Sequence, residues 1–319
     1  MKNILNLLGI CILIFVSCTE NKKEKEIRQI PVNMNVTRFD SLFFQTPVNQ
    51  LSTLAKQFPY LFPPEVSDTT WTSKRTDELQ LELYDEVSKT FGDFSEQKKD
   101  LKSIFQHITY YFPKFSAPKI LTLTSDVDYH SRVIYADTLV VIGLDNYLGA
   151  NHKFYEGIAE YIRFSFDKKY LSTDVALAIS EVMIPRERNL TFLDAMIYEG
   201  KRLYLAQKFL PNTSEVILLK YPREKYDWAM ANESEIWRYF IQNQLLYNTD
   251  KKTLDRFINL APFSKFYMEH DSESPGAIGR FIGLHIVNSF MKKHPDNLEK
   301  LLRIKSEELF IQANYKPSK

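Results

Sequence analysis

Cysteine is almost missing from this chain, which has two cysteines in 319 residues. Cys11 lies inside an apolar N-terminal run and Cys18 follows that run, so the remainder of the chain has no thiol. Disulfides, cysteine nucleophiles and thiolate metal sites are therefore excluded from the folded part. The fold must depend on its apolar core, and a chain of this length can supply one.

An excess of charge of one sign is also missing. The chain carries 41 Lys and Arg residues against 40 Asp and Glu residues. Proteins that bind nucleic acid usually carry a basic excess on one face, so we expect no nucleic-acid partner. The apolar fraction of 44% is typical of a globular protein with a sizeable core.

Common catalytic and metal-binding motifs are missing as well. The chain has no P-loop, no dinucleotide-binding glycine motif and no nucleophile elbow. Its six histidines never stand in pairs at a ligand spacing on one helix. His152, Glu156 and Glu160 recur every four residues, but a solvated helix face explains that spacing better than a metal site. We expect no metal and no cofactor.

The one long apolar run lies at the N-terminus. Ile4–Val16 has the length of a signal-peptide core and is too short to cross a bilayer comfortably. It ends at Ser17-Cys18, which resembles the lipobox of bacterial lipoproteins, with Phe15 in place of the usual leucine. The resemblance implies a lipoprotein signal peptide over 1–17 and acyl chains such as palmitate on Cys18. An ordinary cleaved signal peptide with an incidental cysteine is the alternative.

Residues 18–36 are polar and mixed in charge, which predicts a flexible tether between the lipid and the folded part. Lipid on Cys18 would hold the protein at a membrane without a transmembrane helix. We find no linker, repeat or low-complexity tract further on, and we therefore predict a single domain over 37–316.

Helical periodicity dominates that domain. In Thr72–Phe91, for example, Leu79, Leu83 and Val87 recur at a spacing of four. Alternating apolar residues predict strands over 119–124, 132–135 and 138–143. The predicted fold class is mainly α (α+β), a single helical domain with a small sheet of about three strands. Helices are predicted over 47–58, 72–91, 96–112, 154–164, 172–183, 189–209, 223–231, 233–247, 251–258, 277–293 and 296–303.

Glycine is scarce, with nine residues, and three of them lie between Gly276 and Gly283. No Lys-Ser or Lys-Thr pair follows them, so a phosphate loop is not indicated. Gly279 and Gly283 share a helix face and predict the close approach of a neighbouring helix.

The stretch Asn189–Pro211 predicts the central helix of the domain. Apolar residues lie on two of its faces, which is typical of a helix enclosed by its neighbours. Glu199, Lys201 and Arg202 must then be paired or open to a cleft. Tyr198 and Arg202 stand where a zinc peptidase carries the histidines of His-Glu-x-x-His. Arginine cannot bind zinc, so we expect neither a metal nor catalytic residues here.

The chain resembles the GldB family of gliding-motility lipoproteins of Bacteroidetes bacteria. The resemblance is carried, in family order, by residues 38–40, 142–149, 193–201, 232–240, 245–247, 261–263 and 274–279. It implies a lipid-anchored protein of the cell envelope, with its domain in the periplasm. It also implies a requirement for gliding motility and protein partners in the gliding and type IX secretion machinery.

The family in turn resembles distant zinc-peptidase-like proteins, which implies a zincin-like architecture. In those proteins strands precede the His-Glu-x-x-His helix, and a carboxylate ligand follows it. Glu199, Glu233 and Glu235 keep that order here without the histidines, which suggests a pseudoenzyme. The resemblance makes a candidate cleft of Tyr198, Glu199, Lys201, Arg202, Glu233 and Glu235.

Three functions stay open at this point. The first is a non-catalytic accessory or scaffold protein of the gliding and secretion apparatus. The second is a metal-independent protein that binds or hydrolyses peptide or peptidoglycan in a cleft around Tyr198, Glu199 and Arg202. The third is a structural domain whose partner surface lies elsewhere.

Overall fold

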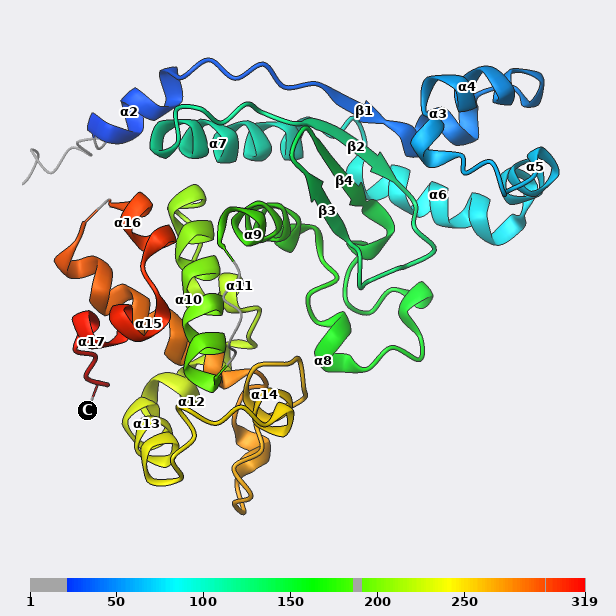
Figure 1. Cartoon of the computed structure of the whole chain (residues 1–319). Helices are drawn as coiled ribbons and strands as arrows, with labels where there is room; N and C mark the ends of the chain where they lie inside the picture. The colour runs from blue at the N-terminus through cyan, green and yellow to red at the C-terminus, as the bar shows by residue number, and fades with distance from the viewer. Residues whose placement is uncertain (1–21, 186–190, 296, 319) are drawn as a thin grey trace, which may run out of the picture.

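The computed structural model describes residues 22–185, 191–295 and 297–318, so the predicted signal peptide and Cys18 lie outside the described residues. One small sheet and many helices form a single domain, which confirms the mainly α class (Figure 1). The elements are α2 (Lys22–Gln29), β1 (Val36–Arg38), α3 (Phe39–Gln45), α4 (Leu51–Gln57), α5 (Asp68–Thr76), α6 (Glu78–Phe91), α7 (Ser95–Tyr111), β2 (Lys119–Leu123), β3 (Val133–Ala136), β4 (Leu139–Gly143), α8 (Glu160–Arg163), α9 (Leu171–Met183), α10 (Phe192–Phe209), α11 (Glu215–Leu219), α12 (Arg223–Ala231), α13 (Glu233–Gln242), α14 (Lys251–Phe257), α15 (Ile278–Lys293), α16 (Leu298–Arg303) and α17 (Ser306–Ala313).

The sheet has four strands in the order β1-β2-β4-β3. β1 and β4 run parallel to β2, and β3 pairs antiparallel with β4. Alternate residues face opposite sides: Ile120 and Val140 join the main core, whereas Leu121 joins a second apolar cluster. The prediction of about three strands missed β1, because three residues are too few to show an alternating pattern.

The second apolar cluster lies on the other face of the sheet. Phe39 and Phe43 of α3 pack with Phe58, Phe62 and Trp71, all at ring-centroid distances between 5.0 and 6.3 Å. In Figure 1 helices α3 to α5 lie at the opposite end of the molecule from α2. Aromatic side chains of the N-terminal segment thus cover a sheet face that the main core leaves open.

The predicted tether needs a correction over its described part. Lys22–Gln29 is helix α2, and its Ile27 is fully buried. The Gln106 amide of α7 donates to the carbonyls of Arg28 and Ile30, at 2.8 and 3.0 Å. The prediction was wrong here because the highly charged composition of this segment indicated a solvated tether, although its single apolar residue, Ile27, is enough to pack it on the domain. Residues 22–30 belong to the domain and are not a free linker.

Several helix boundaries also differ from the prediction. The helix expected over 72–91 is two helices, because the Asp77 side chain caps the start of α6. The one expected over 154–164 is a short 3-10 turn followed by the four-residue α8. Helices α3, α11 and α17 were not predicted. Among the described residues, none of the helices combines the length and the apolar character that a membrane span requires.

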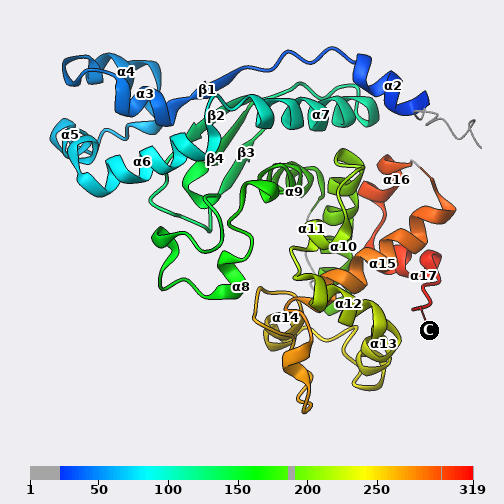
Figure 2. The same cartoon turned by 180° about the vertical axis from the view of Figure 1, so that it is seen from behind.

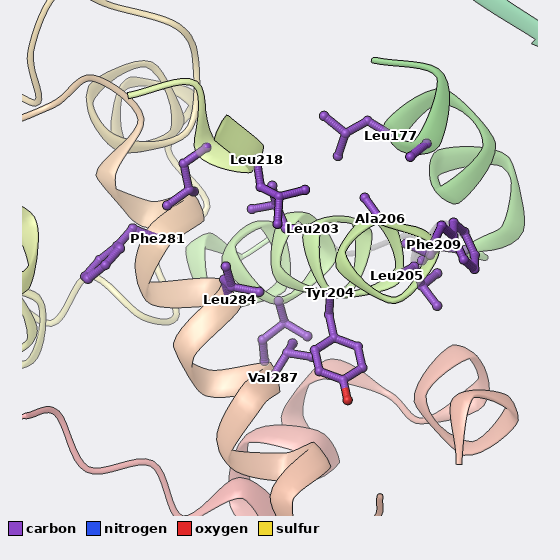
Figure 3. Close-up of a cluster of buried hydrophobic side chains, with 14 of the residues drawn as sticks. Leu177, Leu203, Tyr204, Leu205, Ala206, Phe209, Leu218, Phe281, Leu284 and Val287 are labelled. Atoms are coloured by element: carbon purple, nitrogen blue, oxygen red, sulfur yellow. The ribbon is translucent and has the colours of Figure 1, made fainter. Parts of the chain in front are cut away.

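Helix α10 is the centre of the domain, with α9 on one side and α15, α16 and α17 on the other (Figures 1 and 2). Its apolar side chains point both ways: Leu203 lies toward Leu218, and Tyr204 points away on the opposite side of the helix (Figure 3). The two-faced apolar pattern is therefore confirmed as that of an enclosed helix.

Glycines make the crossing of α10 and α15 possible. A Cβ atom on Gly283 would overlap the Met196 carbonyl of α10, and one on Gly200 would overlap the Gly283 carbonyl. The predicted close approach is confirmed at Gly283. Gly279 instead faces α14, where an added Cβ would lie 2.8 Å from the Phe257 carbonyl oxygen.

Candidate functional site

A capping box fixes the start of α10. Thr191 Oγ1 accepts a hydrogen bond from the Asp194 amide at 3.1 Å, and the Asp194 carboxylate accepts one from the Thr191 amide at 2.9 Å. This pairing satisfies two of the amides that the first helical turn leaves open. It sets the register of the helix and so the direction in which Glu199 and Arg202 point.

Glu199 is held in ion pairs. Its side chain is 12% exposed, and its Oε2 accepts from Arg202 Nη2 at 2.8 Å and lies 3.7 Å from Arg280 Nε. Burial opposes ionisation, but the guanidinium groups of Arg280 and Arg202 outweigh it and lower the pKa of Glu199. A general base needs a pKa close to the working pH. Glu199 is instead a fixed carboxylate that neutralises two arginines.

Arg202 connects this pair to a second carboxylate. Its Nη1 lies 3.3 Å from Glu181 on α9, while its Nε is buried without a hydrogen-bond partner among the described residues. Burial disfavours the charged form, yet Glu199 and Glu181 keep the pKa of Arg202 raised. A buried donor that lacks an acceptor is unusual in a native fold and marks the position as one to explain.

A cavity of about 520 Å³ opens beside Arg202. Its walls come from α9, α10, α11, the start of α15 and the segments 129–133 and 161–166. Both Arg202 and Arg280 line it, whereas Tyr198 and Glu199 are not among its lining residues. The cavity is therefore lined by the two arginines that pair with Glu199 and not by the Glu199 carboxylate itself.

A second charged cluster lies on the same cavity wall. Asp174 of α9 pairs with Lys220 and lies 3.3 Å from Arg132 Nη2, and the Tyr147 hydroxyl donates to it at 2.9 Å. Burial raises the pKa of Asp174, but Arg132 and Lys220 outweigh that effect and the pKa is lowered. Arg132 also donates to the Ser165 carbonyl at 3.1 Å, which fixes its guanidinium at the cavity.

The other residues of the predicted cleft lie elsewhere. The Lys201 ammonium donates to the Ile304 carbonyl at 2.6 Å, and the side chain is almost fully buried. Tyr198 packs against the main core. Glu235 is exposed and pairs with Arg238 of its own helix. The structure thus brings Glu199 and Arg202 together and separates them from Lys201 and Glu235.

Glu233 lines a different cavity, of about 560 Å³. Its carboxylate lies 2.6 Å from His285 Nδ1 and accepts from the Tyr315 hydroxyl at 2.6 Å. On the other side of the ring, His285 Nε2 lies 3.6 Å from Glu215. Burial lowers the pKa of His285, but Glu215 and Glu233 outweigh it and raise the value to about 9. A protonated imidazole has no lone pair for a metal. In this form His285 is a cation held between two carboxylates.

Metal ligands do not converge in the described part of the chain, where no group of three His, Cys, Asp or Glu side chains could hold an ion. His152 instead caps a 3-10 turn and lies 3.4 Å from Glu86, while Glu156 and Glu160 are exposed. The spacing of four did not produce a shared helix face, because residues 152–156 are not α-helical.

Sequence reasoning missed both the Arg132–Asp174–Lys220 cluster and the cation His285. Their members come from elements that are distant in sequence, so no spacing connects them. It also missed Asp145, which is fully buried and accepts from the amides of Ser125 and Val127 at 2.9 and 2.6 Å. Asp145 does lie inside the stretch 142–149 on which the family resemblance rests, and that was the one available signal.

Comparison with known families agrees with that resemblance. The family model described as gliding motility protein GldB matches residues 20–317. The chain belongs to the GldB family. No curated protein and no solved structure matches it. Membership in the GldB family makes it a gliding motility protein, and the match includes helix α2, the whole cavity beside Arg202 and all of the second cavity except Ser318.

Proposed function

We propose that this GldB family member is a non-catalytic, lipid-anchored envelope protein that supports the gliding and type IX secretion machinery. The observation that carries the non-catalytic part is the environment of Glu199. In a zinc peptidase this glutamate would face a metal-bound water; here two arginines hold it as a carboxylate. The zincin-like architecture remains part of this proposal, since it rests on the order of Glu199, Glu233 and Glu235 in the sequence.

Anchoring through Cys18 would place the domain close to the membrane. Helix α2, which packs on α7, begins at Lys22, four positions after Cys18. Four extended residues span at most about 14 Å. The domain would therefore lie against the bilayer surface in the periplasm, and its partners would be proteins that are reachable there.

A cysteine comparison within the chain tests the anchor. We expect Cys18→Ser to leave the membrane fraction and to abolish gliding when it replaces the wild-type gene. Cys11→Ser is the matched control, because Cys11 would be removed with the signal peptide and the change should have no effect. Cys18→Ser that stays with the membrane and restores gliding would contradict the anchor.

The second candidate function is metal-independent binding of peptide or peptidoglycan. One observation favours it, the 520 Å³ cavity beside Arg202. Ala178 lines this cavity from α9, so Ala178→Trp should block it. Val182→Trp is the control, because Val182 lies one turn further along α9 and is 60% exposed. Co-sedimentation with isolated peptidoglycan that both variants retain would exclude the cavity as the binding site.

A further inference from the structure

The cavity beside Arg202 carries more positive charge than its described carboxylates neutralise. Asp174 forms ion pairs with both Lys220 and Arg132, and Glu199 forms ion pairs with both Arg202 and Arg280. Glu181 adds a third carboxylate at the rim, where its side chain is 37% exposed. Four cations thus meet three carboxylates, which leaves an excess of one positive charge among the described side chains. Partly buried charge without a counter-charge is costly, so the cavity is suited to an anion.

The cationic groups are positioned before any ligand arrives. Arg132 is fixed by Ser165 and lies 5.3 Å above the Phe166 ring. Arg280 Nε donates to the Ile258 carbonyl at 2.8 Å. Arg202 keeps a buried Nε without an acceptor in the described structure. Binding an anion would therefore require little ordering of side chains, and preorganisation of this kind increases affinity.

Part of the remaining cavity wall is apolar, beside the polar side chains of Tyr129, His130 and Ser165. The leucines come from α9, α10 and α11 and from the segment after α14, and Tyr161 lies beside them. Leu260 and Tyr161 are 61% and 39% exposed, which places apolar surface where the cavity meets solvent. A volume near 500 Å³ is within the range of small-ligand pockets. The leucines that line the cavity are Leu177, Leu203, Leu218, Leu219 and Leu260.

We propose that this cavity binds the free carboxyl terminus of a short peptide, with the carboxylate facing Arg132, Arg202 and Lys220 and an apolar side chain against the leucines. A monoanion matches the excess of one charge among the described side chains, whereas a phosphate dianion would exceed it and would face Asp174 and Glu181. Planar guanidinium groups bind carboxylates through paired hydrogen bonds. The inference names the ligand class of the second candidate function and rests on it, but not on the lipid anchor.

The titration of Lys220 adds a pH dependence. Burial and the nearby Arg132 lower the pKa of Lys220 to about 8, although Asp174 opposes them. Arg202 on α10 also faces it and acts in the same direction. The ammonium is lost as the pH rises through this value, and with it the excess positive charge. Affinity for a carboxylate should therefore fall between pH 7 and pH 10.

Matched peptides test the proposal directly on the full chain in detergent. The probes are four N-acetyl tripeptides that end in Ala, Leu, Phe or Lys, each as the free acid and as the C-terminal amide. We expect a free acid that ends in Leu or Phe to bind at least about tenfold more tightly than its amide, the usual effect of a charge-assisted hydrogen bond. No free acid binding better than its amide would overturn the proposal, and so would tighter binding of inorganic phosphate than of every peptide.

Two variants separate the cavity from a general charge effect. Lys220→Met removes the ammonium group, so it should weaken binding of the free acid about tenfold and remove the pH dependence of binding. The substitution leaves Asp174 paired with Arg132 and Tyr147. Lys252→Met removes one exposed positive charge from α14 and should leave binding unchanged. Equal losses in both variants would overturn the assignment to this cavity. Circular dichroism confirms folding, and the comparison of acid with amide stands on the wild-type chain alone.

Discussion

Gly283→Ala should destabilise the domain more than any exposed substitution on the same helix. Gly283 lies where α15 crosses α10, and the added methyl group would overlap the Met196 carbonyl. The obstacle is a main-chain atom, so no rotamer change can relieve it. The two helices would have to move apart, and the packing on both sides of α10 would loosen with them.

The size of this effect follows from two opposing contributions. Overpacking a core costs about 1 to 3 kcal/mol, and a main-chain obstacle places this site at the upper end. Replacing a glycine within a helix by alanine gains about 1 kcal/mol. The net loss in the free energy of unfolding is then about 2 kcal/mol. For a domain of this size such a loss lowers the melting temperature by roughly 4 °C.

Urea unfolding of the full chain in detergent, followed by circular dichroism, measures the difference. The control is Lys292→Ala, an exposed position on α15 that should change the free energy of unfolding by less than about 0.5 kcal/mol. Gly200→Ala, on the facing helix, should resemble Gly283→Ala. An unchanged urea midpoint in Gly283→Ala would refute the close crossing of α10 and α15.

Three further predictions concern buried contacts. The pKa of His285 is raised to about 9, so its ion pairs stabilise the fold fully below the ordinary pKa of 6.5, and this stabilisation is lost as the pH rises through 9. In His285→Gln the free energy of unfolding should no longer fall over this pH range, whereas the wild type should lose on the order of 3 kcal/mol. If the urea midpoints of the variant at pH 6 and pH 9 differ as much as those of the wild type, the prediction is contradicted. Asp145→Ala should lower the free energy of unfolding by about 3 kcal/mol because the Ser125 and Val127 amides lose their acceptor; a thermal melt with a loss under 1 kcal/mol would count against that. Ile27→Asp should detach α2 from α7, and limited proteolysis should then cut within 22–36 about tenfold faster or more, whereas an unchanged cleavage rate would restore the idea of a free tether.

The fold was largely predictable where local pattern decides the structure. Alternating residues gave β2, β3 and β4 to within one residue or so, and two apolar stripes identified α10 as central. Prediction failed where a segment depends on distant partners. Helix α2 is stabilised by α7, about eighty positions away, and its own sequence is highly charged. β1 exists because β2 offers an edge to pair with.

The site was predictable only in part for the same reason. Sequence reasoning put Glu199 and Arg202 in one candidate cleft without assigning a pair, and the structure pairs them as i, i+3 neighbours on α10. Sequence reasoning could not show that Lys201 turns to the Ile304 carbonyl, 103 positions away, or that Glu233 pairs with His285. The cluster of Arg132, Asp174 and Lys220 depends entirely on tertiary contacts.

The metal content of the full chain tests the non-catalytic proposal most directly. The protein would be extracted from membranes with detergent, incubated with excess zinc, desalted and analysed by plasma mass spectrometry. Because Arg202 and Arg280 occupy the Glu199 carboxylate, we predict far less than one zinc ion per chain and no change in Glu199→Ala. One zinc ion per chain that is lost in Glu199→Ala would contradict the proposal.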